Sequence, residues 1–177
     1  AAGGNVRLFN SDHVKFINCS SSYAADGGHG FSIVDSTYCL LEDCWVWGHA
    51  QYAFHFRDGG YHIARRCVAR IDYALENDLY TSAYISYGSD YTEFQNCIAI
   101  DQDQDTYLDD GVNGVVYVAT DHNGYDSPGL VYRGCLFLNC FTNQAGIIGA
   151  ENAGTSHEFQ DCILWGISGD PDNFYDK

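Results

Sequence analysis

The sequence predicts an all-β solenoid of about six coils. Three features of the 177-residue chain lead to this prediction: six cysteines in similar surroundings, a recurring bend residue before them, and a strand-like segment further upstream. The spacings between these cysteines run from 23 to 38 residues. Unequal spacing with a shared pattern is typical of coils that keep a common frame and differ in their loops. The repeated position is occupied by Cys19, Cys44, Cys67, Cys97, Cys135 and Cys162.

Two short strands are expected to meet just before each cysteine. The residue directly before it is Asn18, Asp43, Arg66, Asn96, Gly134 or Asp161. Asn, Asp and Gly tolerate left-handed backbone best, so this position predicts a tight bend. Largely apolar residues precede the cysteine by three positions, namely Phe16, Leu41, Ala64, Phe94, Tyr132 and Phe159. Those that follow it by two are Ser21, Val46, Ala69, Ala99, Phe137 and Leu164. Both sets are predicted to face inward.

A further strand opens each coil. The segments are short and rich in β-branched and aromatic residues, which favour strands. They are 6–9, 31–34, 54–57, 84–87 and 115–119, with the pair 147–148 in the last coil. The first four end at Asn10, Asp35, Asp58 and Gly88, each nine residues before a cysteine. Each coil is therefore predicted to contain a strand, a loop, a strand, a sharp bend, a third strand and a loop of variable length.

This pattern resembles the right-handed parallel β-helix of the pectate-lyase-like superfamily. The cysteine column and the Asn/Asp bend column are similar to that superfamily's internal stacks and asparagine ladder, over roughly residues 5–168. The resemblance implies one right-handed parallel β-helix domain over residues 1–177, a segment of a longer extracellular protein. It does not imply one function, because the superfamily contains lyases, hydrolases, epimerases, esterases, phage tailspikes and adhesins.

The six column cysteines are predicted to be buried, reduced thiols. Residues stacked on successive coils lie about 4.8 Å apart. That separation exceeds the optimum Cβ distance of ~3.8 Å for a disulfide. Cys39 and Cys140 fall outside the column, so we expect a disulfide or free thiols at these two positions.

The charge excludes two classes of partner. Eight Lys and Arg against 24 Asp and Glu give a net charge of −16, which repels nucleic acids and anionic lipid. No apolar run approaches the ~18 residues of a membrane span, so we expect no membrane insertion. This composition fits an extracellular or cell-surface location, including a virion surface.

The best candidate site lies on the first strands of coils three to five, beside the longest predicted loops. Strict alternation directs one set of side chains inward: Phe31, Ile33, Phe54, Phe56, Tyr84, Ser86, Val116 and Val118. The opposite set is predicted to face solvent: Arg7, Ser32, His55, Arg57, Ile85, Tyr87 and Tyr117. His55, Arg57 and Tyr87 are the candidate catalytic residues, with Tyr117 binding substrate. Arg57 would neutralise a uronate carboxylate, and His55 or a tyrosine would take the neighbouring proton.

Carboxylates crowd the neighbouring loops. Alternating aspartates suit Ca²⁺, which prefers several oxygen ligands. The candidate calcium ligands are Asp101, Asp103, Asp105, Asp109 and Asp110. On the preceding loop, the candidate substrate-binding carboxylates are Asp72, Glu76 and Asp78. A pair of these carboxylates could alternatively serve glycoside hydrolysis.

The remaining histidines give weaker indications of a functional site. Gly28-His29-Gly30 is similar to the GHG motif of the polygalacturonase family, but the paired Asp and the RIK motif of that family are missing. We therefore do not predict a polygalacturonase. The other histidines are interpreted as surface or bend residues: His13, His49, His62, His122 and His157.

Two functions remain open at this point. The first is recognition of an extracellular polysaccharide, with or without cleavage by a lyase or hydrolase mechanism. The second is a purely structural segment of a fibre, adhesin or phage tailspike. Uncapped solenoid ends expose strand edges, so we also expect homo-oligomers or end-to-end stacking.

Overall fold

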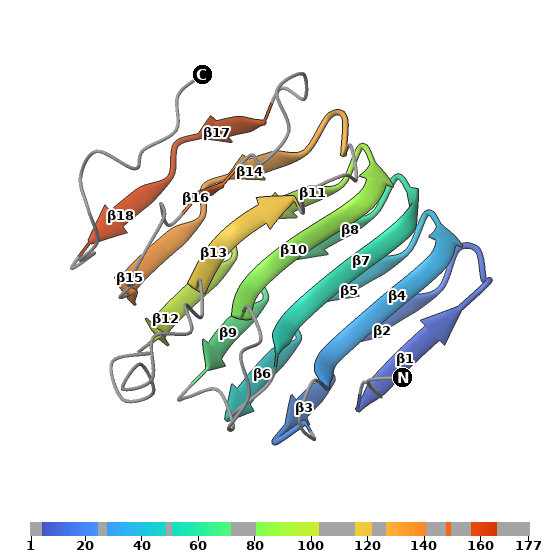
Figure 1. Cartoon of the computed structure of the whole chain (residues 1–177), viewed down its shortest axis with the longest axis horizontal. Coiled ribbons are helices and arrows are strands. Elements are labelled where there is room, and N and C mark those ends of the chain that lie inside the picture. Colours follow the sequence, from blue (N-terminus) through green and yellow to red (C-terminus); the bar gives the residue numbers. More distant parts are fainter. Residues whose placement is uncertain are drawn as a thin grey trace, which may run out of the picture.

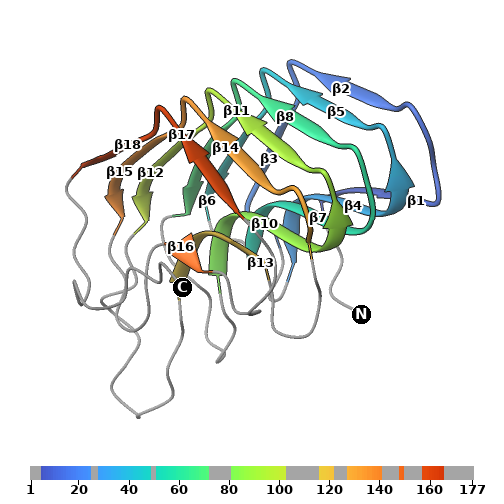
Figure 2. The ribbon, with the colours of Figure 1, turned by 90° about the horizontal axis from the view of Figure 1, so that it is seen from above.

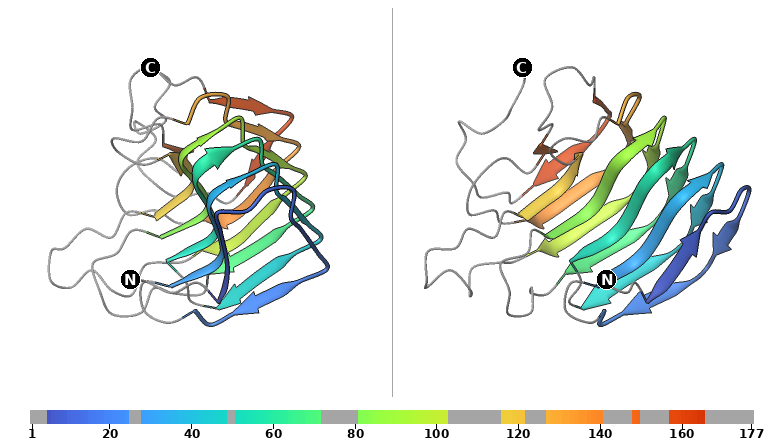
Figure 3. Two further views of the ribbon diagram at one scale, coloured as in Figure 1. Left: turned by 90° about the vertical axis from the view of Figure 1, so that its right-hand side faces the viewer. Right: turned by 45° about the vertical axis from the view of Figure 1, so that its right-hand side comes forward.

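The computed structural model shows a parallel β-solenoid built from three sheets (Figure 1). It describes residues 5–24, 28–48, 51–71, 81–102, 116–121, 127–140, 148–149 and 157–165. Each sheet contains six parallel strands, one from each successive passage of the chain, and together the sheets form the sides of the solenoid (Figures 2 and 3). The predicted all-β solenoid is confirmed.

Within each sheet, strands from successive coils lie side by side. Sheet A contains β1 (Val6–Phe9), β4 (His29–Thr37), β7 (Tyr52–Gly60), β10 (Thr81–Asp90), β13 (Val116–Asp121) and β16 (Ile148–Gly149). Sheet B contains β2 (Lys15–Ile17), β5 (Leu40–Glu42), β8 (Ile63–Arg65), β11 (Glu93–Gln95), β14 (Val131–Arg133) and β17 (Glu158–Gln160). Sheet C contains β3 (Ser20–Ser22), β6 (Trp45–Gly48), β9 (Val68–Ile71), β12 (Ile98–Gln102), β15 (Leu136–Cys140) and β18 (Ile163–Trp165).

The predicted bend column is confirmed between sheets B and C. All six residues directly before the column cysteines have φ between 50° and 62°. Arg66 adopts this conformation too, although it carries a long side chain, and it reaches back to Asp43 of the preceding coil. Its Nε and Nη2 lie 2.7 and 2.9 Å from the two carboxylate oxygens of Asp43. This ion pair bridges two bends on the outside of the solenoid.

Positive φ also marks the predicted ends of the first strands in the first four coils. Asn10, Asp35, Asp58 and Gly88 have φ between 48° and 59°. The prediction of four-residue strands ending at these residues is wrong for β4, β7 and β10, because ladder pairing continues past the left-handed residue, for example from Ser36 to Gly59. These three strands are nine or ten residues long.

A third corner, which the sequence reasoning missed, carries stacked aromatic rings. His13, Tyr38, Tyr61 and Tyr91 all have positive φ, and each precedes a column cysteine by six residues. Successive ring centroids lie 5.0, 4.9 and 5.1 Å apart with nearly parallel planes. Stacking covers the ring faces, so this surface presents ring edges and hydroxyl groups to solvent.

The solenoid interior is filled by side chains that repeat from coil to coil. About four turns, β4 to β15, contribute the fully buried core, whereas the first and last coils supply partly buried residues. Phe31, Phe54 and Tyr84 stack at 5.5 and 5.4 Å on successive strands of sheet A. In sheet B, Tyr132 stacks on Phe94 and Phe159 at 4.9 and 4.8 Å. The inward direction predicted for these residues is confirmed.

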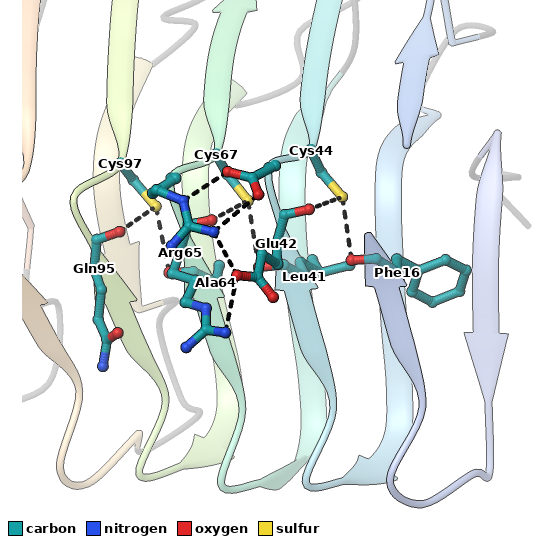
Figure 4. A network of polar contacts seen from close by, with 11 residues as sticks. Phe16, Leu41, Glu42, Cys44, Ala64, Arg65, Cys67, Gln95 and Cys97 are labelled. Carbon is teal, nitrogen blue, oxygen red and sulfur yellow. Dashed lines mark hydrogen bonds and ion pairs between the residues drawn. The ribbon is translucent and has the colours of Figure 1, made fainter. Parts of the chain in front are cut away.

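The column cysteines form a line of thiols along one edge of the interior (Figure 4). Cys44, Cys67 and Cys97 each lie 3.3–3.5 Å from the carbonyl oxygen two residues earlier and from one on the preceding coil. The seven cysteines whose side chains are described are free, Cys39 included, as predicted for the column. Burial raises the pKa of the Cys97 thiol well above its usual range. These thiols therefore act as small core side chains.

One histidine lies in the core rather than at the surface. His62 is fully buried and stacks on Phe56 at 4.9 Å. Its Nδ1 accepts a hydrogen bond from the backbone N–H of Cys39 at 3.3 Å. The interpretation of His62 as a surface or bend residue is wrong, because it occupies the inward position five residues before a column cysteine.

Candidate functional site

An interruption of the strand alternation creates the candidate site on the outer side of sheet A. Two consecutive residues of β7, Ala53 and Phe54, both belong to the buried core. The residues on either side of this pair, Tyr52 and His55, therefore both lie on the outer side. The preceding strand repeats this arrangement, since Phe31 is in the core and His29 pairs in register with Tyr52.

Four rings from three adjacent strands meet at this place. His29 comes from β4, Tyr52 and His55 from β7, and Tyr87 from β10. The His55 ring centroid lies 4.5 Å from that of His29, 5.3 Å from that of Tyr52 and 5.2 Å from that of Tyr87. The hydroxyl groups of Tyr52 and Tyr87 are 2.5 Å apart. We call these four residues the His–Tyr cluster.

His55 has one engaged and one available ring nitrogen. Its Nδ1 lies 3.1 Å from the hydroxyl oxygen of Ser32 on β4. Its Nε2 is buried and has no hydrogen-bond partner among the described residues, and the same holds for Nδ1 of His29. Buried polar atoms normally have partners. Two orphaned imidazole nitrogens in contacting rings therefore mark a place where a ligand can accept or donate hydrogen bonds.

Both histidines of the cluster are held neutral. Burial, followed by the charges of Arg7 and Arg57, lowers the pKa of His29 to about 4. Burial, followed by the charges of His29, Arg57 and Arg7, lowers the pKa of His55 well below its usual range. The positive charges of Arg7 and Arg57 therefore act on this site, although the chain has a net charge of −16. Positive charges near a site attract anionic ligands.

The structure brings together some of the predicted site residues and separates others. His55 and Tyr87 are in contact within the cluster. Arg57 pairs in register with Tyr87, but its side chain is exposed and its Nε lies 3.0 Å from the Asp58 carboxylate. Tyr117 pairs in register with Ser82, which itself pairs with Tyr52, so the Tyr117 backbone continues the row of Tyr52.

The predicted carboxylate sites lie largely outside the described residues. This applies to Asp72, Glu76, Asp78, Asp103, Asp105, Asp109 and Asp110. Asp101 lies in β12, of which only the backbone is described at that position. Within the described ranges, no group of three or more His, Cys, Asp or Glu side chains is placed to hold a metal ion.

The prediction that the outer face of sheet A is open to solvent is wrong for most of its residues. Ser32, His55, Ile85 and Tyr87 are all buried, whereas Arg7 and Arg57 are exposed. The physical reason is that large side chains on this face pack against one another. His29 and Tyr52 were missed because strict alternation does not place them beside His55, although the GHG segment drew attention to His29.

Within the part of the chain that the structure describes, there is no helix long and apolar enough to cross a membrane. Comparison of the chain with protein-family models, with curated proteins and with solved structures found no match.

Proposed function

We propose that the protein is an extracellular module of the pectate-lyase-like superfamily that binds an anionic polysaccharide on the outer side of sheet A and cleaves it. The observation that carries this proposal is the contact of His55, whose buried Nε2 has no hydrogen-bond partner among the described residues, with the rings of Tyr52 and Tyr87, near the charges of Arg7 and Arg57. General bases and proton donors of this kind serve reactions next to a carboxylate.

The reaction that this cluster suits is β-elimination in a uronate chain. Arg57 pairs with the uronate carboxylate. Nε2 of His55 takes the proton from the carbon that bears the carboxylate. The bond between the neighbouring ring carbon and the glycosidic oxygen breaks, and a double bond forms between these two carbons. A hydroxyl of the Tyr52–Tyr87 pair gives a proton to the departing oxygen. Nothing is oxidised or reduced, and the product carries an unsaturated end.

The charge of the substrate also supports the basicity of His55. Besides burial, His29, Arg57 and Arg7 lower the pKa of His55. A bound carboxylate offsets those positive charges and so raises the pKa of the imidazole. His55 would then become a stronger base when an anionic sugar is in place.

The test is a panel of uronate-containing and neutral polysaccharides, scored for binding and for unsaturated products by their ultraviolet absorbance. Replacing a general base reduces the rate by roughly 100-fold or more, so we expect such a loss in His55→Gln and a comparable one in Arg57→Ala. His13→Gln is the matched control, because it removes an exposed imidazole at another corner of the solenoid.

The outcomes separate the alternatives. Binding without cleavage would make the protein a recognition module, and cleavage without unsaturated ends would point to hydrolysis by the loop carboxylates. If the folded protein neither bound nor cleaved any polysaccharide of the panel, this result would contradict the proposal. It would favour a purely structural segment.

Calcium is proposed for the aspartate segment 101–110, whose alternating carboxylates are the kind of oxygen ligands that this ion prefers. We expect EDTA to lower both the polysaccharide affinity and the melting temperature, with Ca²⁺ restoring them. An unchanged melting temperature in EDTA would exclude a structural calcium site.

A further inference from the structure

An arginine on the outer side of sheet A lies in the same row as His55. Arg7 of β1 is exposed, whereas its neighbours Val6 and Leu8 pack against the core. Arg7 pairs in register with Ser32, and Ser32 pairs in register with His55. The strands β1, β4 and β7 lie side by side in sheet A, so Arg7 is two strands away from the His–Tyr cluster (Figure 1).

The guanidinium group of Arg7 is held in a way that leaves its hydrogen-bond donors available. Its Cζ atom lies 5.9 Å from the centroid of the Phe9 ring, which is a cation–π contact. Such a contact involves the face of the aromatic ring and uses none of the five N–H donors of a guanidinium. Among the described residues, no carboxylate forms an ion pair with Arg7.

Other arginines of the chain contrast with Arg7. Those that pair with a carboxylate are Arg57, Arg65, Arg66 and Arg133. The chain has 24 Asp and Glu against eight Lys and Arg, so carboxylates are abundant. An exposed arginine without such a partner in this acidic chain is suited to an anion from outside. A guanidinium binds a carboxylate through two parallel hydrogen bonds.

Arg7 and Arg57 are too far apart to bind one and the same carboxylate. The guanidinium of Arg7 lies beside Phe9, which pairs in register with Val34, and Val34 pairs in register with Arg57. The two arginines are therefore separated by roughly 10 Å at the backbone, because adjacent strands lie ~4.8 Å apart. This separation suits two carboxylates on different units of one polymer.

We propose that Arg7 is a second carboxylate-binding residue, and that the ligand is a polyuronate chain that crosses sheet A from β7 to β1. One carboxylate of this chain pairs with Arg57 beside the His–Tyr cluster, and another carboxylate further along the chain pairs with Arg7. The inference rests on the proposed function and narrows it to a substrate with closely spaced uronates. A polysaccharide with single, widely spaced uronates would not engage both arginines.

Calorimetric titration with uronate oligomers of increasing length tests the proposal. All the proteins compared carry His55→Gln, so that the oligomers stay intact. We expect Arg7→Ala to weaken the affinity for the longer oligomers roughly tenfold, as for the loss of one hydrogen bond between charged groups. The affinity for the shortest oligomers, which cannot reach both arginines, should be unchanged. Long oligomers with methyl-esterified carboxylates should bind equally to the proteins with and without Arg7→Ala.

Two further variants serve as controls. Arg133→Ala removes the same charge from an exposed arginine of sheet B and should leave the affinity for every oligomer unchanged. Arg7→Lys should retain part of the affinity for long oligomers, because lysine keeps the charge but lacks the planar fork of the guanidinium. Far-ultraviolet circular dichroism shows that each variant is folded.

The outcomes distinguish this inference from the proposed function. An unchanged affinity for long oligomers in Arg7→Ala would overturn the inference, and so would an equal loss in Arg133→Ala, which would reveal a general effect of charge. In either case, cleavage of uronate oligomers by the unmodified protein would leave the proposed function standing. If the unmodified protein bound no uronate oligomer, the proposed function would fail and this inference with it.

Discussion

Acidification from pH 6.5 to pH 4 is expected to unfold the protein or bring it close to unfolding. Three histidines are buried: His29, His55 and His62. Burial lowers the pKa of His62 to about 4, and His29 has a similar value. The pKa of His55 is also lowered, well below its usual range. In the unfolded chain each titrates near 6.5.

The sign follows from proton linkage. Below pH 6.5 the unfolded state binds protons that the folded state does not, so the free energy of unfolding falls as the pH falls. For His29 and His62 the loss levels off near pH 4, when the folded protein is protonated too. Between pH 6.5 and pH 4, each of these two histidines lowers the free energy of unfolding by about 3 kcal/mol. The total free energy of unfolding of a typical domain is about 5–15 kcal/mol.

Denaturant titrations at several pH values measure this effect. The free energy of unfolding of His62→Gln should depend less steeply on pH than that of the unmodified protein, by about 1.4 kcal/mol per pH unit. Thr92 holds the same position in the next coil and is also fully buried. Thr92→Val is therefore the matched control, which changes the free energy of unfolding but not its dependence on pH. If His62→Gln also left this pH dependence unchanged, the lowered pKa assigned to His62 in the folded protein would be refuted.

Replacing Gly59 by alanine is expected to destabilise the solenoid by about 3 kcal/mol or more. Gly59 has a φ of 154°, and a Cβ there would lie 2.0 Å from the backbone oxygen of Ser36 on the preceding coil. A backbone atom cannot rotate away as a side chain can. The two coils would have to separate, which breaks ladder pairing between β4 and β7.

Thermal unfolding of Gly59→Ala measures this loss of stability. A loss of about 3 kcal/mol lowers the melting temperature of a domain of this length by roughly 10 °C. Ser89 occupies the corresponding position of the next coil, already carries a Cβ and is fully buried. Ser89→Ala removes one hydroxyl and should cost only about 1 kcal/mol. Equal melting temperatures for the two variants would contradict the steric argument.

The coil frame could be predicted because its determinants are local and repeated. The bend before each cysteine depends on residues such as Asn18 and Asn96 that accept left-handed backbone. Their regular position before the cysteines can be recognised in the sequence. The aromatic corner at Tyr38 and Tyr61 escaped prediction because tyrosine is not a typical left-handed residue. Its conformation is stabilised by stacking between coils, which no local pattern reveals.

The candidate site was only partly predictable. Alternation correctly placed His55 and Tyr87 on the outer side of sheet A, but it could not place Tyr52 beside them. That required the double inward step at Ala53 and Phe54, which depends on how the two side chains fit the interior next to Gly30. A Cβ on Gly30 would lie 2.6 Å from Val46 and 2.7 Å from the backbone oxygen of Ala53.

The sequence by itself determined the all-β solenoid, the inward column of unpaired thiols and the strand that carries His55. Burial was decided by the tertiary structure. It placed His62 in the core and enclosed the His–Tyr cluster on a face that alternation assigns to solvent. The physical reason is that periodicity states the direction of a side chain, whereas the volume and neighbours on the adjacent coils determine whether water reaches it.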